Sequence, residues 1–303
     1  MSYEIMTDSS SNLTKDLLER YRVRMISYIS SVDGEEFLCY SPEREDAEAG
    51  RHFYEAMRKG SDVRTTLINM SRFTEAFEEI LAAGRDILFV CMSGGLTGTV
   101  QAAHIAAEDL MEQYPERKII CIDSLSASLG EGLLVLRLSR LRAAGATLEE
   151  AAAWYEKHKL RMNHIFTVGD LKYLKKGGRI SAAEAVIGNL LSIKPILKAD
   201  DEGKIVIHDK VRSRKRALDY LVEMTKQRIV NPASQIIGIA HCDAPMEADY
   251  IAGRFRHELN AQDVIVRYYD LCTGSHVGPG TIAIFFLGEN RMGPPPAVIG
   301  KAI

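Results

Sequence analysis

Short apolar runs alternate along this chain with longer segments in which apolar residues recur at the spacing of a helix. An apolar run of roughly four to eight residues predicts a buried strand, and the helical period predicts a helix with one covered face. In the first half the predicted strands are 4–8, 23–30, 87–93 and 118–124. The predicted helices are 12–20, 45–59, 71–83, 99–113, 126–143 and 148–160. This order is typical of a parallel sheet covered by helices on both faces.

The pattern changes after about residue 162. A strand at 164–170 is followed by a basic turn that contains two glycines and by a helix at 181–192. Further strands are predicted at 204–210, 236–242, 264–270 and 281–288, with helices at 211–228 and 246–259. The sequence therefore predicts two α/β domains, residues 1–162 and residues 163–303.

Composition and charge narrow the classes of function. With 46% hydrophobic and 26% charged residues, the chain is expected to fold around a sizeable core, and its net charge of -3 disfavours nucleic acid as a partner. The five cysteines form no CxxC pair and the histidines no HExxH or HxH motif, so we expect no disulfide framework, no metal and no cofactor. Acids at Glu4 and Asp8 and the shortness of the apolar runs indicate a cytoplasmic protein without a signal peptide or membrane span.

The segment MSGGLTGT, residues 92–99, follows a predicted strand and precedes a predicted helix. Its glycines permit close approach to the backbone, and free N–H groups at a helix start bind anions such as a phosphate or a carboxylate. A tight turn without a ligand is the alternative. The segment lacks the lysine of a Walker A loop and the GxSxG pattern of a nucleophile elbow.

Four other segments carry candidate chemistry. TDSSSNLT (7–14) is explained equally well by capping of the next helix and by a ligand at the end of a strand. Thr65 and Thr66 lie in a segment, 63–69, that reads as a polar turn. In LKYLKKGGRIS (171–181) the charges are expected to face solvent, although a glycine turn carrying Arg179 also suits docking to an acidic partner. His276 lies in the glycine- and proline-rich GSHVGPGT, which reads as a shaped loop.

Taken in order, TDSSSNL, the two threonines before a helix, SGGLTGT, IDSLSASLGEG, LKYLKKGGRIS and SHVGPGT resemble the DegV family. The resemblance implies a Rossmann-like N-terminal domain with a parallel sheet, a C-terminal α/β domain with a mixed or antiparallel sheet, and a lipid site between them. It also implies a non-catalytic protein that binds a long-chain fatty acid. Such a protein presents the carboxylate to a separate, dihydroxyacetone-kinase-like fatty acid kinase and can carry the acyl phosphate onward. Transient contact with a membrane surface is compatible with this role.

The resemblance implies roles for particular residues. Thr65 and Ser93 match hydroxyls expected to hold the carboxylate, with Thr66, Gly94 and His276 beside them. Arg179 matches an arginine expected at the kinase-facing surface. Two motifs depart from the family pattern, because TTLIN stands in place of TSQPS and SGGLTGT in place of SSxLSGT. These departures bear on which ligand is preferred.

Two other functions remain open on the sequence alone. One is a hydrolase or phosphotransferase that uses Ser93, although no elbow, P-loop lysine or metal cluster supports it. The other is a lipid-responsive regulatory module that has the same pocket but no kinase partner. Neutral hydroxyl donors would suit the carrier, since they orient a carboxylate and leave it nucleophilic.

Overall fold

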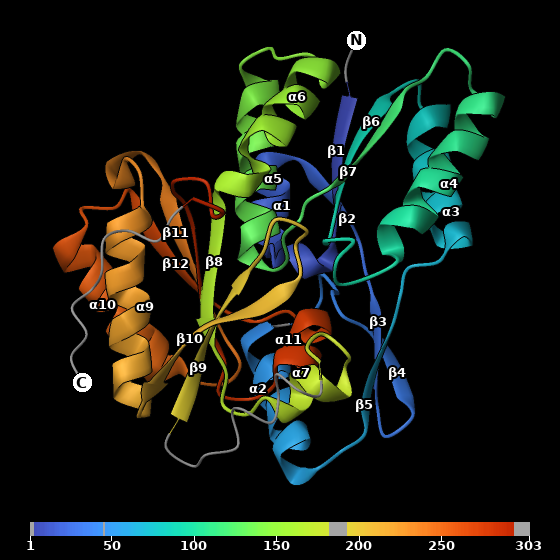
Figure 1. Cartoon of the computed structure of the whole chain (residues 1–303). Coiled ribbons are helices and arrows are strands. Elements are labelled where there is room, and N and C mark those ends of the chain that lie inside the picture. Colours follow the sequence, from blue (N-terminus) through green and yellow to red (C-terminus); the bar gives the residue numbers. More distant parts are fainter. Residues whose placement is uncertain (1–2, 45, 182–192, 294–303) are drawn as a thin grey trace.

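The computed structural model describes residues 3–44, 46–181 and 193–293. The helix predicted at 181–192 therefore lies almost entirely outside the described residues. Within the described part, the strands form three sheets, and two of these carry the bulk of the helices (Figure 1). Both large sheets agree with the α/β class that the apolar periodicity predicts.

The first sheet, sheet A, has the strand order β2-β1-β6-β7, and all of its neighbouring strands are parallel. Every residue of β6 is buried, which explains why this strand reads as a continuous apolar run. Helices cover both faces (Figure 1), as predicted. The strands are β1 (Tyr3–Asp8), β2 (Val23–Ile26), β6 (Asp86–Cys91) and β7 (Ile119–Asp123), and the helices are α1 (Lys15–Tyr21), α3 (Met70–Ala82), α4 (Thr99–Gln113), α5 (Leu129–Ala143) and α6 (Leu148–His158).

The second sheet, sheet C, is mixed and has the order β10-β9-β8-β13-β11-β12. Of these described strands, only β11 and β12 pair in parallel, and the remaining neighbours are antiparallel. Helices α9 (Arg214–Arg228) and α10 (Pro245–Glu258) pack on it, in addition to α5. Its strands are β8 (Met162–Thr167), β9 (Ile193–Ala199), β10 (Ile205–Arg212), β11 (Ile236–His241), β12 (Asp263–Tyr268) and β13 (Ile282–Leu287).

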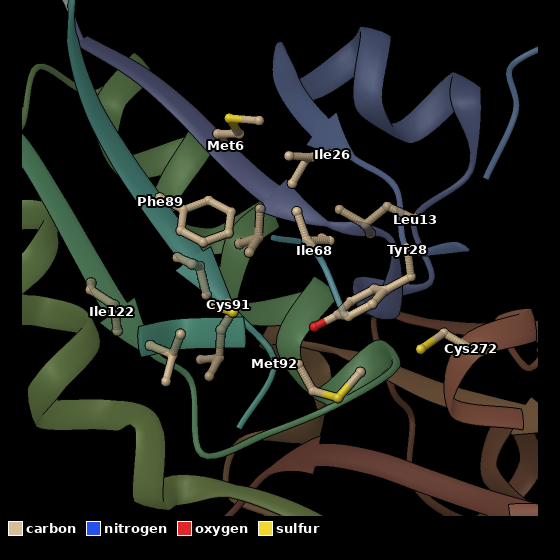
Figure 2. Close-up of a cluster of buried hydrophobic side chains, with 14 of the residues drawn as sticks. Met6, Leu13, Ile26, Tyr28, Ile68, Phe89, Cys91, Met92, Ile122 and Cys272 are labelled. Carbon is tan, nitrogen blue, oxygen red and sulfur yellow. The ribbon is translucent and has the colours of Figure 1, made fainter. Parts of the chain in front are cut away.

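Helix α5 contacts strands of both large sheets, among them β1, β6, β8 and β11. Most of its residues are buried, including the carboxyl-bearing Glu131. A helix that is covered on nearly all sides needs apolar residues all round, and LLVLRLSRL supplies them. One hydrophobic core therefore spans both sheets, and part of it is shown in Figure 2. A second core lies between sheet C and helices α9 and α10.

The strand predicted at 23–30 is wrong as a single element. It divides into β2, in sheet A, and β3 (Ile29–Val32), which joins a small antiparallel sheet, sheet B, of order β4-β3-β5. The break falls at Tyr28, whose backbone N–H donates to Ser9 Oγ at 2.9 Å and so leaves the ladder of sheet A. The other strands of sheet B are β4 (Glu35–Leu38) and β5 (Val63–Thr66). The segment 63–69 is therefore a strand at its start and not only a polar turn.

The loop predicted around His276 is in fact helical up to Val277. Helix α11 (Leu271–Val277) begins with a cap, because Asp270 Oδ1 accepts a hydrogen bond from Thr273 N at 2.7 Å. α11 packs against α7 (Lys172–Lys176), α2 (Asp46–Lys59) and β5, so it brings C-terminal residues among N-terminal elements (Figure 1). The glycine- and proline-rich segment 278–281 is the turn that follows this helix.

Candidate functional site

A cavity of about 180 Å³ lies where β5, the loop after β6, the turn after α7 and α11 meet, with Tyr28 and Ile205 completing its wall. Six segments distant in sequence therefore build the wall, and many of the lining side chains are apolar. The lining residues are Tyr28, Thr65, Thr66, Leu67, Met92, Leu96, Thr97, Gly98, Arg179, Ile205, Cys272, Thr273, His276 and Val277.

Thr65 and His276 are joined directly at the wall of this cavity, with 3.0 Å between Thr65 Oγ1 and His276 Nε2. Burial, and secondarily the nearby charge of Arg179, lower the pKa of His276 to about 4. The imidazole is therefore neutral at neutral pH, and the pair offers a hydroxyl and a ring nitrogen that can each donate or accept. Thr66 lines the cavity next to them on the more exposed side of β5.

Two glycines allow α7 and α11 to approach closely enough to form this wall. A Cβ atom on Gly177 would lie 2.4 Å from His276 Nδ1, and one on Gly278 would lie 2.1 Å from the Tyr173 ring. Gly278 also has a φ of +80°, which other residues rarely adopt. The glycines of KKGG and GPG are thus explained by the packing around His276.

Arg179 is half-buried on the wall of the same cavity. Its Nε and Nη2 atoms donate to the carbonyl oxygen of Leu96 at 3.2 and 3.0 Å, and Nη1 donates to the carbonyl of Gly177. Burial lowers the pKa of this guanidinium. Arg179 therefore fastens the loop after β6 to the turn after α7, and its predicted contact with a partner protein stays a prediction.

Ser93 and Gly94 do not line this cavity. The buried Ser93 hydroxyl donates to the carbonyl of Gly203 at 3.1 Å and accepts the N–H of Gly95, also at 3.1 Å. The N–H of Gly94 bonds to both carboxylate oxygens of Asp123 at 3.1 Å. The carboxylate that meets this glycine loop is thus the chain's own. The structure groups Thr65, Thr66, His276 and Arg179, and the proposed carboxylate contacts of Ser93 and Gly94 stay predictions.

The sequence reasoning missed three polar residues on the wall: Thr97, Thr273 and Tyr28. Thr97 Oγ1 lies 2.8 Å from Thr99 Oγ1 at the end of the glycine loop. Its position next to Gly98 in this loop is the feature of the sequence that could have identified it as a site residue. Thr273 precedes His276 by three positions, which puts both on one face of a helix. That spacing is informative only if the segment is helical, and its glycine-rich sequence does not predict a helix.

Tyr28 connects the cavity to a buried acid. Its hydroxyl lies 3.5 Å from Asp8 Oδ2, which also accepts the N–H of Met92 at 2.8 Å, and Tyr28 and Met92 lie side by side in Figure 2. Burial raises the pKa of Asp8. Asp8 Oδ1 accepts the N–H of Ser10 at 2.8 Å, so Asp8 caps the 3-10 turn Ser9–Ser11. The predicted capping of the following helix is not seen, because Thr14, at the start of α1, makes no side-chain cap hydrogen bond.

The apolar part of the cavity continues toward sheet C. A second space of about 40 Å³ shares Leu96, Ile205, Thr273 and Val277 with the first. Its far wall includes the aromatic rings of Phe166 and Phe285. The combined space therefore has the hydroxyls of Thr65 and Thr66 and the imidazole of His276 at one end and a mainly hydrocarbon and aromatic wall at the other. The polar side chains Ser126 and His164 of that far wall are bonded to each other, with 2.6 Å between Ser126 Oγ and His164 Nε2.

No group of three potential metal ligands occurs among the described residues. Nor does any helix in the described ranges have the length and apolar character needed to cross a bilayer. The fold and the cavity define a class: α/β proteins in which a parallel and a mixed sheet enclose a largely apolar cavity with a polar end.

Comparison with known proteins identifies the family within this class. The sequence profile of the DegV family, described as uncharacterised proteins, matches residues 2–289. A DegV domain-containing protein of Clostridium perfringens is 37% identical over 290 residues, covering 95% of this chain and 98% of the relative. The chain belongs to the DegV family, as the order of its motifs predicts.

Solved structures agree with this assignment. A DegV family protein from Thermus thermophilus, described in terms of its fatty acid binding, has a TM-score of 0.82 and 27% identity, covering 94% of this chain and 99% of that one. DegV from Bacillus subtilis, described as a fatty acid binding protein, has a TM-score of 0.79 and 25% identity, with coverage of 94% and 98%. The two-sheet α/β fold predicted from the family resemblance is therefore confirmed.

Proposed function

We propose that this protein binds one long-chain fatty acid and has no catalytic activity of its own. The carboxylate lies at Thr65, Thr66 and His276, and the tail occupies the apolar space toward Phe166 and Phe285. The observation that carries the proposal is the cavity's two-ended character, because a carboxylate removed from water requires donors and a hydrocarbon tail requires none. The fatty-acid-binding relatives from Thermus thermophilus and Bacillus subtilis support it.

The magnitudes are consistent with a reversible carrier. Burying about 15 methylene groups at about 0.8 kcal/mol each gives roughly 12 kcal/mol before the costs of binding. Lost translational freedom and ordering of the chain remove at least about 4 kcal/mol of this. The remainder corresponds to tight binding from which the ligand can still be released.

The finer part of the proposal is that the bound carboxylate is presented to a separate, dihydroxyacetone-kinase-like fatty acid kinase. The groups proposed to bond the carboxylate are uncharged, because Thr65 and Thr66 offer hydroxyls and the low pKa of His276 keeps its ring neutral. The charged Arg179 lies on the same wall, but its nitrogens already donate to backbone carbonyls. Such donors orient a carboxylate without pairing its charge, which keeps it able to attack ATP. The exposed lysines of α7 next to the cavity suit an acidic partner surface.

Lipid binding is tested first by mass spectrometry of lipid extracted from the natively folded protein. We expect one fatty acid per chain, and about 10-fold or greater loss of affinity for added fatty acid in Thr65→Val, since a hydrogen bond to a charged group is removed. Thr74→Val is the matched control, because that hydroxyl bonds to Met70 O within α3 and lines neither part of the cavity. A protein that stays empty when offered fatty acids, or equal affinity in both variants, would refute the proposed site.

The kinase role is tested separately by supplying the lipid-bound protein and ATP to a purified fatty acid kinase and measuring acyl phosphate. We expect Lys175→Glu, on the exposed side of α7, to reduce product formation and to leave fatty acid affinity unchanged. Lys157→Glu, on the exposed side of α6, is the control. Fatty acid binding without phosphorylation by any such kinase would favour the regulatory module and leave the lipid site intact.

The hydrolase alternative draws no support from the surroundings of Ser93. Among the described residues, the hydrogen-bond partners of its side chain are two backbone groups, the carbonyl of Gly203 and the N–H of Gly95. A nucleophilic serine needs a neighbouring base. Absence of ester hydrolysis and of labelling by a serine-directed inhibitor is therefore expected.

A further inference from the structure

A second cavity, of about 250 Å³, lies where α5 and α6 meet the ends of three interior strands of sheet C, β8, β11 and β13. Among the described residues, it shares no lining residue with the cavity around His276. Its volume is close to the lower end of the range for small organic ligands, about 300–1,000 Å³. We call it the arginine cavity, because Arg137, Arg140 and Arg161 line it.

The charges in the arginine cavity are all of one sign. Its lining contains three arginines and His158 but no aspartate or glutamate among the described residues. Within the same described ranges, none of the three arginines forms an ion pair with a carboxylate, although several other half-buried arginines do. Three unpaired cations around one hollow, in a chain whose net charge is -3, create a local positive potential that attracts an anion.

The arginines are held so that donors remain free. The Nε of Arg161 donates to the carbonyl of Gly288 at 3.1 Å, and its two terminal amino groups form no hydrogen bond within the described part of the chain. Arg140 Nη2 donates a hydrogen bond to the hydroxyl of Tyr21 at 3.0 Å, and its guanidinium lies over the Tyr21 ring. Arg137 is exposed one turn before Arg140 on α5, and its guanidinium has no partner among the described residues. Free guanidinium forks match the paired oxygens of a phosphate group.

The remaining wall suits the body of an organic molecule. Trp154 and His158 are stacked, with ring centroids 4.3 Å apart and an interplanar angle of 17°. His158 Nδ1 lies 2.7 Å from the carbonyl of Trp154, so this nitrogen carries the proton and Nε2 is left for another partner. Leu133 and Leu136, one turn from the arginines on α5, add an apolar surface.

From these observations we propose that the arginine cavity binds a small organic phosphate, with the phosphate group between Arg137 and Arg161 and a planar or apolar body against Trp154 and Leu133. The chemistry shared by the candidate ligands is a phosphate or diphosphate dianion. A nucleoside diphosphate supplies both the dianion and a planar ring, whereas inorganic pyrophosphate supplies the dianion alone. This site is independent of fatty acid binding.

The chain contains one tryptophan, so intrinsic fluorescence reports on this cavity without background from other indoles. The full chain is titrated with ADP, pyrophosphate and adenosine, and calorimetry measures each binding directly. We expect saturable binding of ADP, weaker or equal binding of pyrophosphate, and no binding of adenosine. If ADP binds more tightly than pyrophosphate, the adenine ring contributes to binding. If the two bind equally, the phosphate groups account for all of the affinity.

Arg137→Gln and Arg161→Gln are expected to weaken ADP binding about 10-fold each, because each removes a charged hydrogen bond. The control is Arg216→Gln on α9, since Arg216 is likewise exposed and without an ion pair in the described residues. Arg137 is exposed, so its variant is expected to unfold with the same urea midpoint as the parent. The proposal is overturned if neither ADP nor pyrophosphate binds at millimolar concentration, or if the Arg137 and Arg216 variants bind equally.

Discussion

Replacing Gly177 by alanine tests whether the approach of α7 to α11 holds His276 in place. Gly177 has φ -75° and ψ -9°, a conformation that alanine adopts without strain, so the substitution perturbs contacts and not the backbone preference. The added Cβ would lie 2.4 Å from His276 Nδ1, whereas ordinary contacts begin at 3.4 Å. The imidazole or α7 must therefore move by about 1 Å, which is enough to break the 3.0 Å contact with Thr65.

Two costs follow from that movement. Overpacking of a filled site destabilises proteins by about 1–3 kcal/mol, and loss of one hydrogen bond by about 1 kcal/mol. We therefore expect Gly177→Ala to lower the free energy of unfolding by about 2–4 kcal/mol and to weaken fatty acid binding. Urea denaturation and ligand titration of the same protein preparation measure the two effects.

The matched control is Gly253→Ala on α10, where an added Cβ has nothing within 4 Å. That change is expected to stabilise the protein by up to about 1 kcal/mol, since alanine is the better helix former. If Gly177→Ala behaves like Gly253→Ala, with no loss of stability or of ligand affinity, then His276 is not held by this contact. The glycines of KKGGRIS would then have to be explained by something other than close packing against the His276 imidazole.

Two further predictions concern the join between the N- and C-terminal segments. Burial raises the pKa of Asp270 from 3.8 to about 8, so the folded state keeps a proton that the unfolded chain has released, and stability should fall as pH rises from about 4 to 8. Asp270→Asn should flatten that part of the stability profile in urea denaturation, and a parallel profile for parent and variant would contradict the assignment. Tyr54 donates to the carbonyl of Tyr269 at 3.0 Å in a buried position, so Tyr54→Phe should cost about 1 kcal/mol. An unchanged thermal midpoint for Tyr54→Phe would show that this bond contributes nothing.

Much of sheet A could be predicted because its strands are largely buried on both faces. The run ILFVC of β6 is entirely buried, and no other element type explains so short and so apolar a segment between helices. Sheet B could not be predicted in this way. Glu35 and Glu36 of β4 are exposed, and Thr65 and Thr66 of β5 alternate between half-buried and exposed, so these strands carry little hydrophobic pattern.

Helix α11 was not predicted, because its sequence, LCTGSHV, has a low intrinsic helix propensity. Gly274 weakens it further, yet a Cβ at that position would lie 1.9 Å from the hydroxyl oxygen of Tyr54. The glycine is therefore required by packing against α2, and tertiary contacts together with the Asp270 cap stabilise the helix. Predicting this helix would have required knowing which residues pack against position 274, and the sequence does not show them.

An N–H group of the glycine loop after β6 meets an anion that belongs to the chain itself. The sequence predicts that N–H groups at SGGLTGT meet an anion, and Gly94 does bind a carboxylate, that of Asp123. Asp123 ends the neighbouring parallel strand, so the anion comes from the same sheet edge at which an external ligand would bind. Ser93 in turn bonds to the Gly203 carbonyl of the β9–β10 turn. The loop thereby ties sheet A to sheet C and adds Thr97 to the cavity wall. The hydroxyls around His276 come from β5 and α11, two elements far apart in sequence that pack against each other.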